Sequence, residues 1–166
     1  MRGARARFPD LTSPPGWTGF ALPPQVRLIP PGTTKASARA TIIVSPIAPR
    51  LPRMPPLDQL IAQAIDAEAS LRLDILERTG PNPAPSDTGL HGISCELRVR
   101  DRNGGEEQRR VYALYCDDKF YYGINYMAFG SEHDKHLDTF WKTARSMRPF
   151  VGAVVPPTAP PTPAID

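Results

Sequence analysis

The sequence predicts a single α+β domain in which an antiparallel β-sheet of about five or six strands is flanked by two main helices. Its 166 residues suit one domain with a sizeable core. None of its 21 prolines lies between Ser86 and Arg148. Because proline is excluded from helix interiors and central strands, regular structure is expected to concentrate there. Three strand-like segments in close succession, followed by a helical pattern, occupy that stretch.

Prolines and charges also predict the limits of the domain. Twelve prolines fall in the first 56 residues and five lie between Pro156 and Pro163. The first 56 residues carry eight Lys or Arg and one Asp, whereas the rest of the chain carries twelve basic and sixteen acidic residues. We therefore expect a flexible basic N-terminal arm over residues 1–16, the domain over residues 17–149, and a Pro-rich C-terminal tail over residues 150–166.

Four segments precede the first expected helix. Residues 17–22 are expected to form a short strand or edge segment, and Pro-rich turns bracket residues 26–29. Residues 38–45 are β-branched and apolar on both faces near their middle, which is typical of a strand. Residues 46–56 contain five prolines, so extended surface chain is expected there.

A helix is expected over residues 57–71. Leu57, Ile61 and Ile65 recur every four residues, as on the buried face of a helix. The polar residues of this segment are expected to lie mostly on the other side: Asp58, Gln59, Gln63, Asp66 and Glu68. A strand over residues 73–78 follows. Thr79-Gly80-Pro81 is expected to end it, and a loop continues to Gly89.

Three strands are expected next. Residues 93–100 alternate apolar and polar side chains, which predicts one buried and one solvated face. The Asn-Gly pair within residues 101–106 supplies the positive φ of a hairpin turn. Residues 110–116 and 120–129 are apolar or aromatic on both faces, so they are expected at the centre of the sheet with something packed on each side.

A second helix is expected to close the domain. Ser131 and Asp134 have the spacing of a capping box, which predicts the start of the helix. An i, i+3, i+4, i+7 stripe predicts its buried face: Leu137, Phe140, Trp141 and Ala144. Pro149 is expected to stop the helix.

No motif of an enzyme or a cofactor site is recognisable, so we predict no catalytic residues, no cofactor and no metal. His133 and His136 have the spacing of two metal ligands on a helix, but a site normally needs a third strong ligand elsewhere.

Cys95 alternates with apolar neighbours and is expected in the core. A cross-strand disulfide between Cys95 and Cys116 is the alternative to two reduced thiols.

The composition also bears on partners and location. No stretch approaches the roughly 20 apolar residues that a membrane span needs. No apolar region follows the basic start of the chain, so no signal peptide is predicted and the cytoplasm is the expected location. The basic residues of the first 56 positions are dispersed, without interleaved aromatic residues, so no nucleic-acid partner is expected.

One resemblance rests on the order of elements and on a few residues. A tyrosine-rich last strand and a short polar turn precede a helix that contains Phe140-Trp141 and ends in Ser146-x-Arg-Pro149, while Trp17-x-x-Phe20 stands early. Over about residues 17–149 this pattern resembles the PsbP-like family, which includes the PsbP extrinsic proteins of photosystem II, the Ran-release factor and bacterial DcrB-like proteins. The resemblance implies an antiparallel sheet flanked by helices, in a PsbP-like sandwich, and a non-catalytic binding role.

The bacterial relatives include Eag-type adaptor chaperones, which cradle apolar effector helices on an exposed sheet face for type VI secretion. The present sequence differs from those chaperones in its Pro-rich arm and tail.

Two helices are few for such a sheet, so one apolar sheet face is expected to be open to a protein partner. On the last strand, the open face is either Tyr121, Asn125, Met127 and Phe129 or Phe120, Tyr122, Ile124 and Tyr126. We expect a protein-binding or adaptor/chaperone domain, not an enzyme, whose partner-binding residues are Tyr121, Met127 and Phe129. A second copy of the chain is one candidate partner.

Two alternative functions stay open at this stage. The chain is then either a structural subunit that docks on a larger assembly through its Pro-rich arm and tail, or a small metal-binding protein or enzyme that uses His133 and His136.

Overall fold

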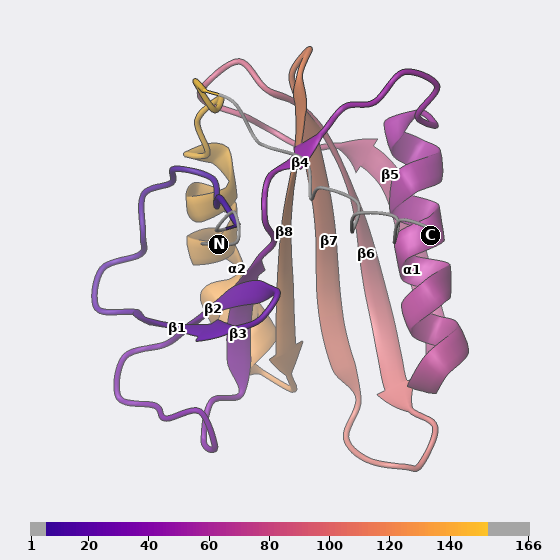
Figure 1. Cartoon of the computed structure of the whole chain (residues 1–166). Coiled ribbons are helices and arrows are strands. Elements are labelled where there is room, and N and C mark those ends of the chain that lie inside the picture. Colours follow the sequence, from indigo (N-terminus) through magenta and orange to yellow (C-terminus); the bar gives the residue numbers. More distant parts are fainter. Residues whose placement is uncertain (1–5, 153–166) are drawn as a thin grey trace, which may run out of the picture.

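An open antiparallel sheet of eight strands forms the centre of the computed structural model, which describes residues 6–152 (Figure 1). The strand order is β1-β2-β3-β8-β7-β6-β5, and β4 also pairs with β8. The strands are β1 (Thr18–Leu22), β2 (Gln25–Ile29), β3 (Ala40–Val44), β4 (Ala48–Pro49), β5 (Leu73–Pro83), β6 (His91–Asp101), β7 (Gln108–Cys116) and β8 (Phe120–Phe129). The α+β class is as predicted, although the strands number eight rather than five or six.

Strands β5 and β4 account for most of the difference from the predicted strands. β5 continues beyond Thr79-Gly80-Pro81, where its end was expected, and Pro83 still pairs with Ile93. A register shift between Thr79 and Asn82 absorbs this irregular segment, as a β-bulge does. Because β5 is an edge strand, it tolerates prolines that a central strand would exclude. β4 is a short piece of the expected extended chain that pairs with the edge of β8 left free by β3.

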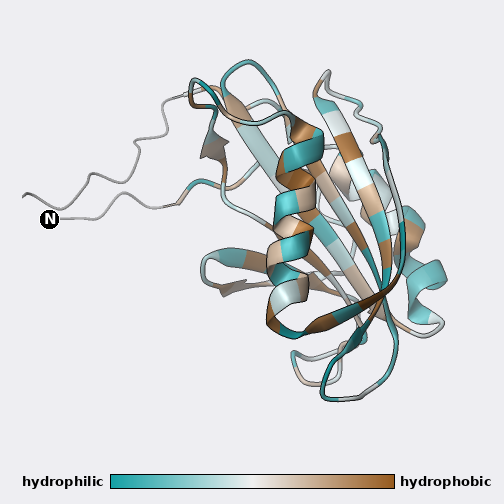
Figure 2. Ribbon diagram, turned by 90° about the vertical axis from the view of Figure 1, so that its right-hand side faces the viewer, coloured by the Kyte–Doolittle hydropathy of each residue, from teal (hydrophilic) through white to brown (hydrophobic). Residues whose placement is uncertain are grey.

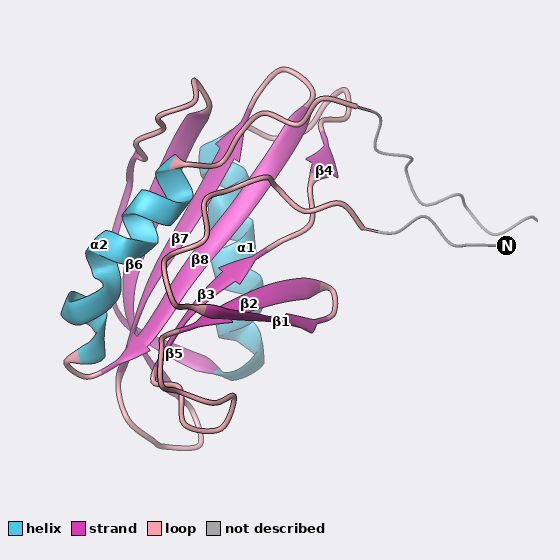
Figure 3. Ribbon diagram, turned by 90° about the vertical axis from the view of Figure 1, so that its left-hand side faces the viewer, coloured by secondary structure: helices cyan, strands magenta, loops and turns pink. Residues whose placement is uncertain are grey.

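The two helices lie on opposite faces of the sheet (Figure 3). α1 (Leu57–Arg72) packs against β5, β6 and β7, whereas α2 (Glu132–Arg145) packs against β8 and β3. Apolar and polar residues alternate around α1 in Figure 2, and its buried residues are Ile61 and Ile65, as the periodicity predicts. The predicted stripe of α2 is also confirmed, because Phe140 and Ala144 are fully buried.

The predicted capping box at Ser131 is wrong. Ser131 already has helical backbone angles (φ −68°, ψ −14°), and its side chain makes no capping hydrogen bond. A capping residue needs an extended backbone so that its side chain can turn back to the first-turn amides. The carboxylate of Asp134 lies instead 3.2 Å from Nδ1 of His133 and 3.8 Å from the guanidinium of Arg109.

Two apolar clusters fill the two faces of the sheet. The larger lies under α2 and includes Tyr122, Tyr126 and Phe140, while the smaller lies under α1. The strands over residues 110–116 and 120–129 are central, as predicted, but only β7 contributes to both clusters. The expectation that something packs on each side of residues 120–129 is wrong for the α1 side, because α1 reaches only β5, β6 and β7. Cys95, in the smaller cluster, pairs with Tyr112 rather than with Cys116, so both thiols are free.

The part of the N-terminal arm that the structure describes lies on the α2 face. Phe8, Leu11 and Trp17 pack against the larger cluster, and Asp10 forms a β-bridge with Arg148. The predicted boundaries at residues 17 and 149 stay predictions. Residues 1–5 and 153–166, with most of the predicted tail, lie outside the described residues.

Candidate functional site

The sheet face under α1 is only partly covered by that helix. α1 lies over β5, β6 and β7, and no other element of residues 6–152 packs on this side of β8, β3 and β2. Two cavities, of about 560 and about 350 Å³, lie over these strands. They share five lining residues and therefore form one groove between α1 and β2: Gln25, Ala64, Glu68, Tyr112 and Asn125.

The strand register aligns a row of side chains across the floor of this groove. Arg27 on β2 pairs with Ile43 on β3, which pairs with Asn125 on β8, which pairs with Tyr112 on β7. Directly paired residues of antiparallel strands point to the same face, so all four side chains face the groove. Three strand spacings separate Arg27 from Tyr112, which makes the groove roughly 14 Å wide at this row.

The smaller cavity is the apolar end of the groove. Its lining includes Leu60 and Ala64 of α1, Pro46 from the segment after β3, and Tyr121 and Gly123 of β8. A Cβ atom at position 123 would meet only the side chain of Ser45, at 3.4 and 3.5 Å, so the fold does not require glycine there. Glycine inside a strand often marks a place where a ligand or another backbone approaches closely.

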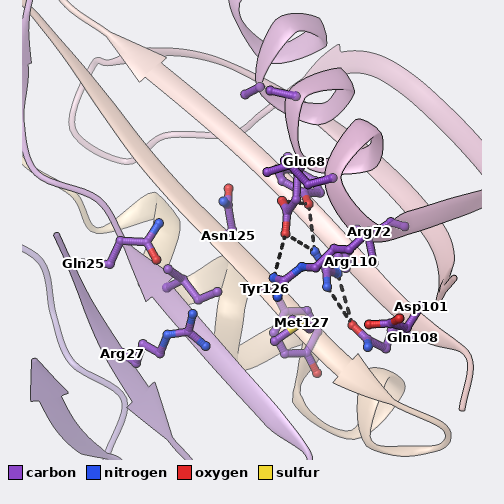
Figure 4. A pocket seen from close by; sticks show the side chains of 16 residues that line it. Gln25, Arg27, Glu68, Arg72, Asp101, Gln108, Arg110, Asn125, Tyr126 and Met127 are labelled. Atoms are coloured by element: carbon purple, nitrogen blue, oxygen red, sulfur yellow. Dashed lines mark hydrogen bonds and ion pairs between the residues drawn. The ribbon is translucent and has the colours of Figure 1, made fainter. Parts of the chain in front are cut away.

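The larger cavity is the polar end, and a closed ionic network forms its wall (Figure 4). The Arg110 side chain, only 7% exposed, donates from Nη1 to Glu68 Oε1 at 2.5 Å and to the Tyr112 hydroxyl at 3.1 Å. Its Nε and Nη2 donate to Gln108 Oε1 at 3.2 and 2.9 Å. The Tyr112 hydroxyl in turn donates to Glu68 Oε2 at 2.5 Å. Each of the three guanidinium nitrogens of Arg110 thus donates at least one hydrogen bond within the protein.

The protonation states of this network are fixed near neutral pH. Burial alone would raise the pKa of Glu68, but the hydrogen bond from Tyr112 and the charge of Arg110 outweigh it and hold that pKa below its usual value of 4.5. Burial raises the pKa of Tyr112 to about 12. Glu68 is therefore charged and Tyr112 neutral, and neither has the near-neutral pKa that favours general acid–base catalysis.

Arg27 faces this network across the groove. Within residues 6–152 it takes part in no salt bridge, and its Nε atom is shielded from solvent without a hydrogen-bond partner. Figure 4 shows its guanidinium reaching from β2 toward Met127. The groove therefore presents a positive charge that the described part of the protein does not neutralise.

The structure distinguishes the two candidate faces of β8. Phe120, Tyr122, Ile124 and Tyr126 are buried on the α2 side of the sheet. The other set faces the same side as the groove: Tyr121, Asn125, Met127 and Phe129.

Of the three predicted partner-binding residues, two line the groove. Tyr121 lines the apolar end, although it is only 7% exposed and the Arg50 guanidinium lies over its ring. Met127 is half-buried and lines the polar end. Phe129 lines neither cavity, and the Arg39 guanidinium lies 5.3 Å from the centre of its ring. That these residues bind a partner stays a prediction.

His133 and His136 lie on α2, away from the groove. His133 is buried, with its ring 5.4 Å from that of Tyr126, and His136 makes an edge contact with Trp17 at 5.3 Å. Among the described residues, no cluster of three or more His, Cys, Asp or Glu side chains has the arrangement of a metal site. Within the same residues, no helix is long and apolar enough to cross a membrane.

Sequence reasoning missed Arg27, Glu68 and Arg110. The prediction that Glu68 lies on the polar side of α1 is wrong, because it follows Ile61 by seven residues, which is about two turns, and so shares its face. Arg110 alternates with Tyr112 on the inward side of β7. Two sequence features could have revealed the buried pair. Glu68 is a single acidic residue on the apolar face of a helix, and Arg110 is a single basic residue at an inward position of a strand. For Arg27 there was none, because an arginine in a short strand most often faces solvent.

No protein-family model matches this sequence, and no curated protein matches it either. Solved structures do match. Cyanobacterial PsbP (CyanoP) from Synechocystis aligns with a TM-score of 0.55 and 14% identity, over 87% of this chain and 93% of that chain. A Pseudomonas aeruginosa protein of unknown function aligns with a TM-score of 0.50 and 13% identity, over 82% of this chain and 99% of that chain.

The yeast Ran-binding protein Mog1p aligns with a TM-score of 0.46 and 11% identity, over 82% of this chain and 80% of that chain. At 14% and 13% identity, the matches to CyanoP and to the Pseudomonas aeruginosa protein show a shared fold only. The match to CyanoP confirms the PsbP-like fold that the sequence resemblance implies.

Proposed function

We propose that this chain, whose fold is that of cyanobacterial PsbP, is a non-catalytic protein-binding or adaptor domain that holds a segment of a partner protein in the groove between α1 and β2. The observation that carries the proposal is the groove itself, an open and partly apolar sheet face at the centre of the domain. Its volume lies in the range of ligand-binding clefts.

The lining of the groove suits a peptide segment. The apolar end, floored by Tyr121 and Gly123, can take an apolar side chain. The amide side chains of Gln25, Gln108 and Asn125 line the groove as well, and amides can both donate to and accept from a bound backbone. A width of roughly 14 Å admits either an extended segment or a helix.

The described part of the arm does not compete for this groove. Phe8, Leu11 and Trp17 pack on the α2 face, which is the opposite face of the sheet. The groove is therefore free for a separate partner without displacement of these residues. The cytoplasmic location stays a prediction, as does the use of the tail as a docking segment.

The test uses the full chain, a phage-displayed library of random 16-residue peptides, and two variants that fill the groove. Ala64→Trp fills it from the helix wall and Gly123→Val from the floor; Ala64 is exposed on α1 and position 123 has room for a side chain. Gln63→Trp is the matched control, because Gln63 is exposed on the same helix and lines neither cavity.

Peptides selected on the wild-type protein should lose at least tenfold in affinity for Ala64→Trp and for Gly123→Val, and should bind Gln63→Trp as they bind wild type. All three variants should keep the wild-type circular-dichroism spectrum and melting temperature within a few degrees. Peptides that bind both filled variants with unchanged affinity would refute the groove as the binding site.

A further inference from the structure

Arg27 is the feature of the groove that its own fold does not explain. Each other arginine that lines the larger cavity has an acidic partner: Arg110 pairs with Glu68 at 2.5 Å and Arg72 with Glu68 at 3.6 Å. Arg27 has none within residues 6–152, and its enclosed Nε has no acceptor. A buried donor without an acceptor is destabilising, so an acceptor supplied from outside the fold would be favourable.

We propose that Arg27 selects the partner by pairing with a carboxylate of the bound peptide segment. This inference rests on the proposed function. A guanidinium and a carboxylate match in shape and charge and form two parallel hydrogen bonds. The surrounding groove excludes part of the water, so this pair is stronger there than on an open surface. A neutral or basic residue at the same place in the peptide would leave Arg27 unpaired or repelled.

The strand register also gives the spacing between this carboxylate and an apolar anchor. Arg27 lies in the row of Asn125, two residues along β8 from Gly123 and two strands away from it. Strand dimensions place the backbone positions of Arg27 and Gly123 roughly 12 Å apart. The Arg27 guanidinium reaches toward Met127, which lies four residues, or roughly 13 Å, along β8 from Gly123, so the spacing at the guanidinium is similar. The recognised segment therefore carries an acidic residue and an apolar residue about two helical turns apart, or about four residues apart if it is extended.

A peptide explains the groove better than a small anionic amphiphile such as a fatty acid. No described element covers the groove, whereas a pocket for an aliphatic chain encloses most of its ligand. Three amide side chains line it, Gln25, Gln108 and Asn125, and they have no counterpart on an aliphatic chain. Oleate is nevertheless a useful comparison ligand in the test.

The test is a double-mutant cycle between protein and peptide. Arg27→Gln removes the positive charge, and the matched control is Arg100→Gln, because Arg100 is exposed on β6 and lines neither cavity. The probes are the peptides selected on wild type in the library experiment, each made with its acidic residue intact and replaced by the corresponding amide.

The acidic peptides should bind Arg27→Gln about 10- to 100-fold more weakly than wild type and bind Arg100→Gln unchanged. The amide peptides should bind wild type and Arg27→Gln equally. A second selection on Arg27→Gln should lose the acidic residue from the selected sequences.

Three results would overturn the inference. If replacing the acidic residue weakens binding to wild type and to Arg27→Gln by the same factor, Arg27 does not read the carboxylate, while groove binding stands. If oleate binds Arg27→Gln more weakly than wild type, while the peptides bind both proteins equally, the ligand is an anionic amphiphile. If the peptides also ignore the groove-filling variants, the proposed function fails and this inference fails with it.

Discussion

Replacing Glu68 by alanine should destabilise the domain, because it removes the acidic partner of a buried arginine. The Arg110 side chain is 7% exposed, and Glu68 accepts from both Arg110 and the Tyr112 hydroxyl. Removing one partner of a fully buried ion pair costs about 3–5 kcal/mol, since it leaves an uncompensated charge.

The remaining hydrogen bonds of the network should keep the loss of stability on Glu68→Ala below about 3–5 kcal/mol. After Glu68→Ala, Arg110 keeps its hydrogen bonds to Gln108 at 3.2 and 2.9 Å and to Tyr112 at 3.1 Å. Glu68 itself is 30% exposed, so solvent already weakens the pair. We therefore expect a loss of about 2–3 kcal/mol in the free energy of unfolding. Arg110→Met should cost about 1 kcal/mol, because Glu68 can turn to solvent and keeps Arg72 nearby.

The assay is urea denaturation of the single variants and of the Glu68→Ala/Arg110→Met double variant, followed by circular dichroism. The double variant should be at least about 1 kcal/mol more stable than the sum of the two single losses predicts, because no unpaired charge remains. The control is Arg72→Met: its pair with Glu68 spans 3.6 Å and its side chain is 61% exposed, so the change should stay within about 0.5 kcal/mol.

Two results would refute this reasoning. The first is a loss below about 0.5 kcal/mol for Glu68→Ala, which is the size of an ordinary surface substitution. The second is additivity of the two single variants within about 0.3 kcal/mol, which would mean that Glu68 and Arg110 do not interact energetically.

Three further predictions concern the rest of the domain. Burial alone would raise the pKa of Asp117, but hydrogen bonds from Tyr122 and from backbone amides hold it below its usual 3.8, so this carboxylate stabilises the fold at neutral pH and stops doing so as the pH falls below 3.8. The difference in unfolding free energy between wild type and Asp117→Asn, measured in urea, should therefore be larger at pH 7 than at pH 3; a difference that does not change with pH would contradict this. Burial raises the pKa of both Cys95 and Cys116, so Ellman's reagent should react with neither thiol in buffer and with both in urea, whereas rapid reaction of the folded protein would contradict their burial. Phe140 is fully buried between α2 and β8, so Phe140→Ala should cost about 3–5 kcal/mol in the same denaturation assay, and a loss below about 1 kcal/mol would show that the α2 cluster is poorly packed.

The fold could be predicted from the sequence because its central elements follow simple periodicities. The alternation of residues 93–100 and the two-sided apolar pattern of residues 110–116 and 120–129 correspond to β6, β7 and β8. The apolar residues that recur at helical spacing within residues 57–71 and 137–144 lie in α1 and α2. These patterns reflect burial on one face or both, which the sequence records directly.

Features that depend on contacts distant in the sequence could not be predicted. β4 exists because Ala48 and Pro49 meet Tyr121 and Phe120 on β8, and nothing local to residues 46–56 specifies that pairing. Ser131 is a different case, because its failure as a cap has a local cause. Its backbone is helical rather than extended, and the residue type alone does not determine the backbone angles. The groove depends on which strands α1 covers, and that arrangement is visible only in three dimensions.

The connection between α1 and β5 explains why the groove exists at all. α1 ends at Arg72 and β5 begins at Leu73, so no loop separates the helix from the edge strand that follows it. The helix is therefore held over β5 and its neighbours β6 and β7, and it cannot shift across the sheet to β8 and β3. On the other face, α2 follows β8 after a turn of two residues, Gly130 and Ser131, and covers the centre, and the described part of the arm packs beside it. The uncovered strands thus follow from how the helices are joined to the sheet, not from loose packing, and no other element of residues 6–152 covers them.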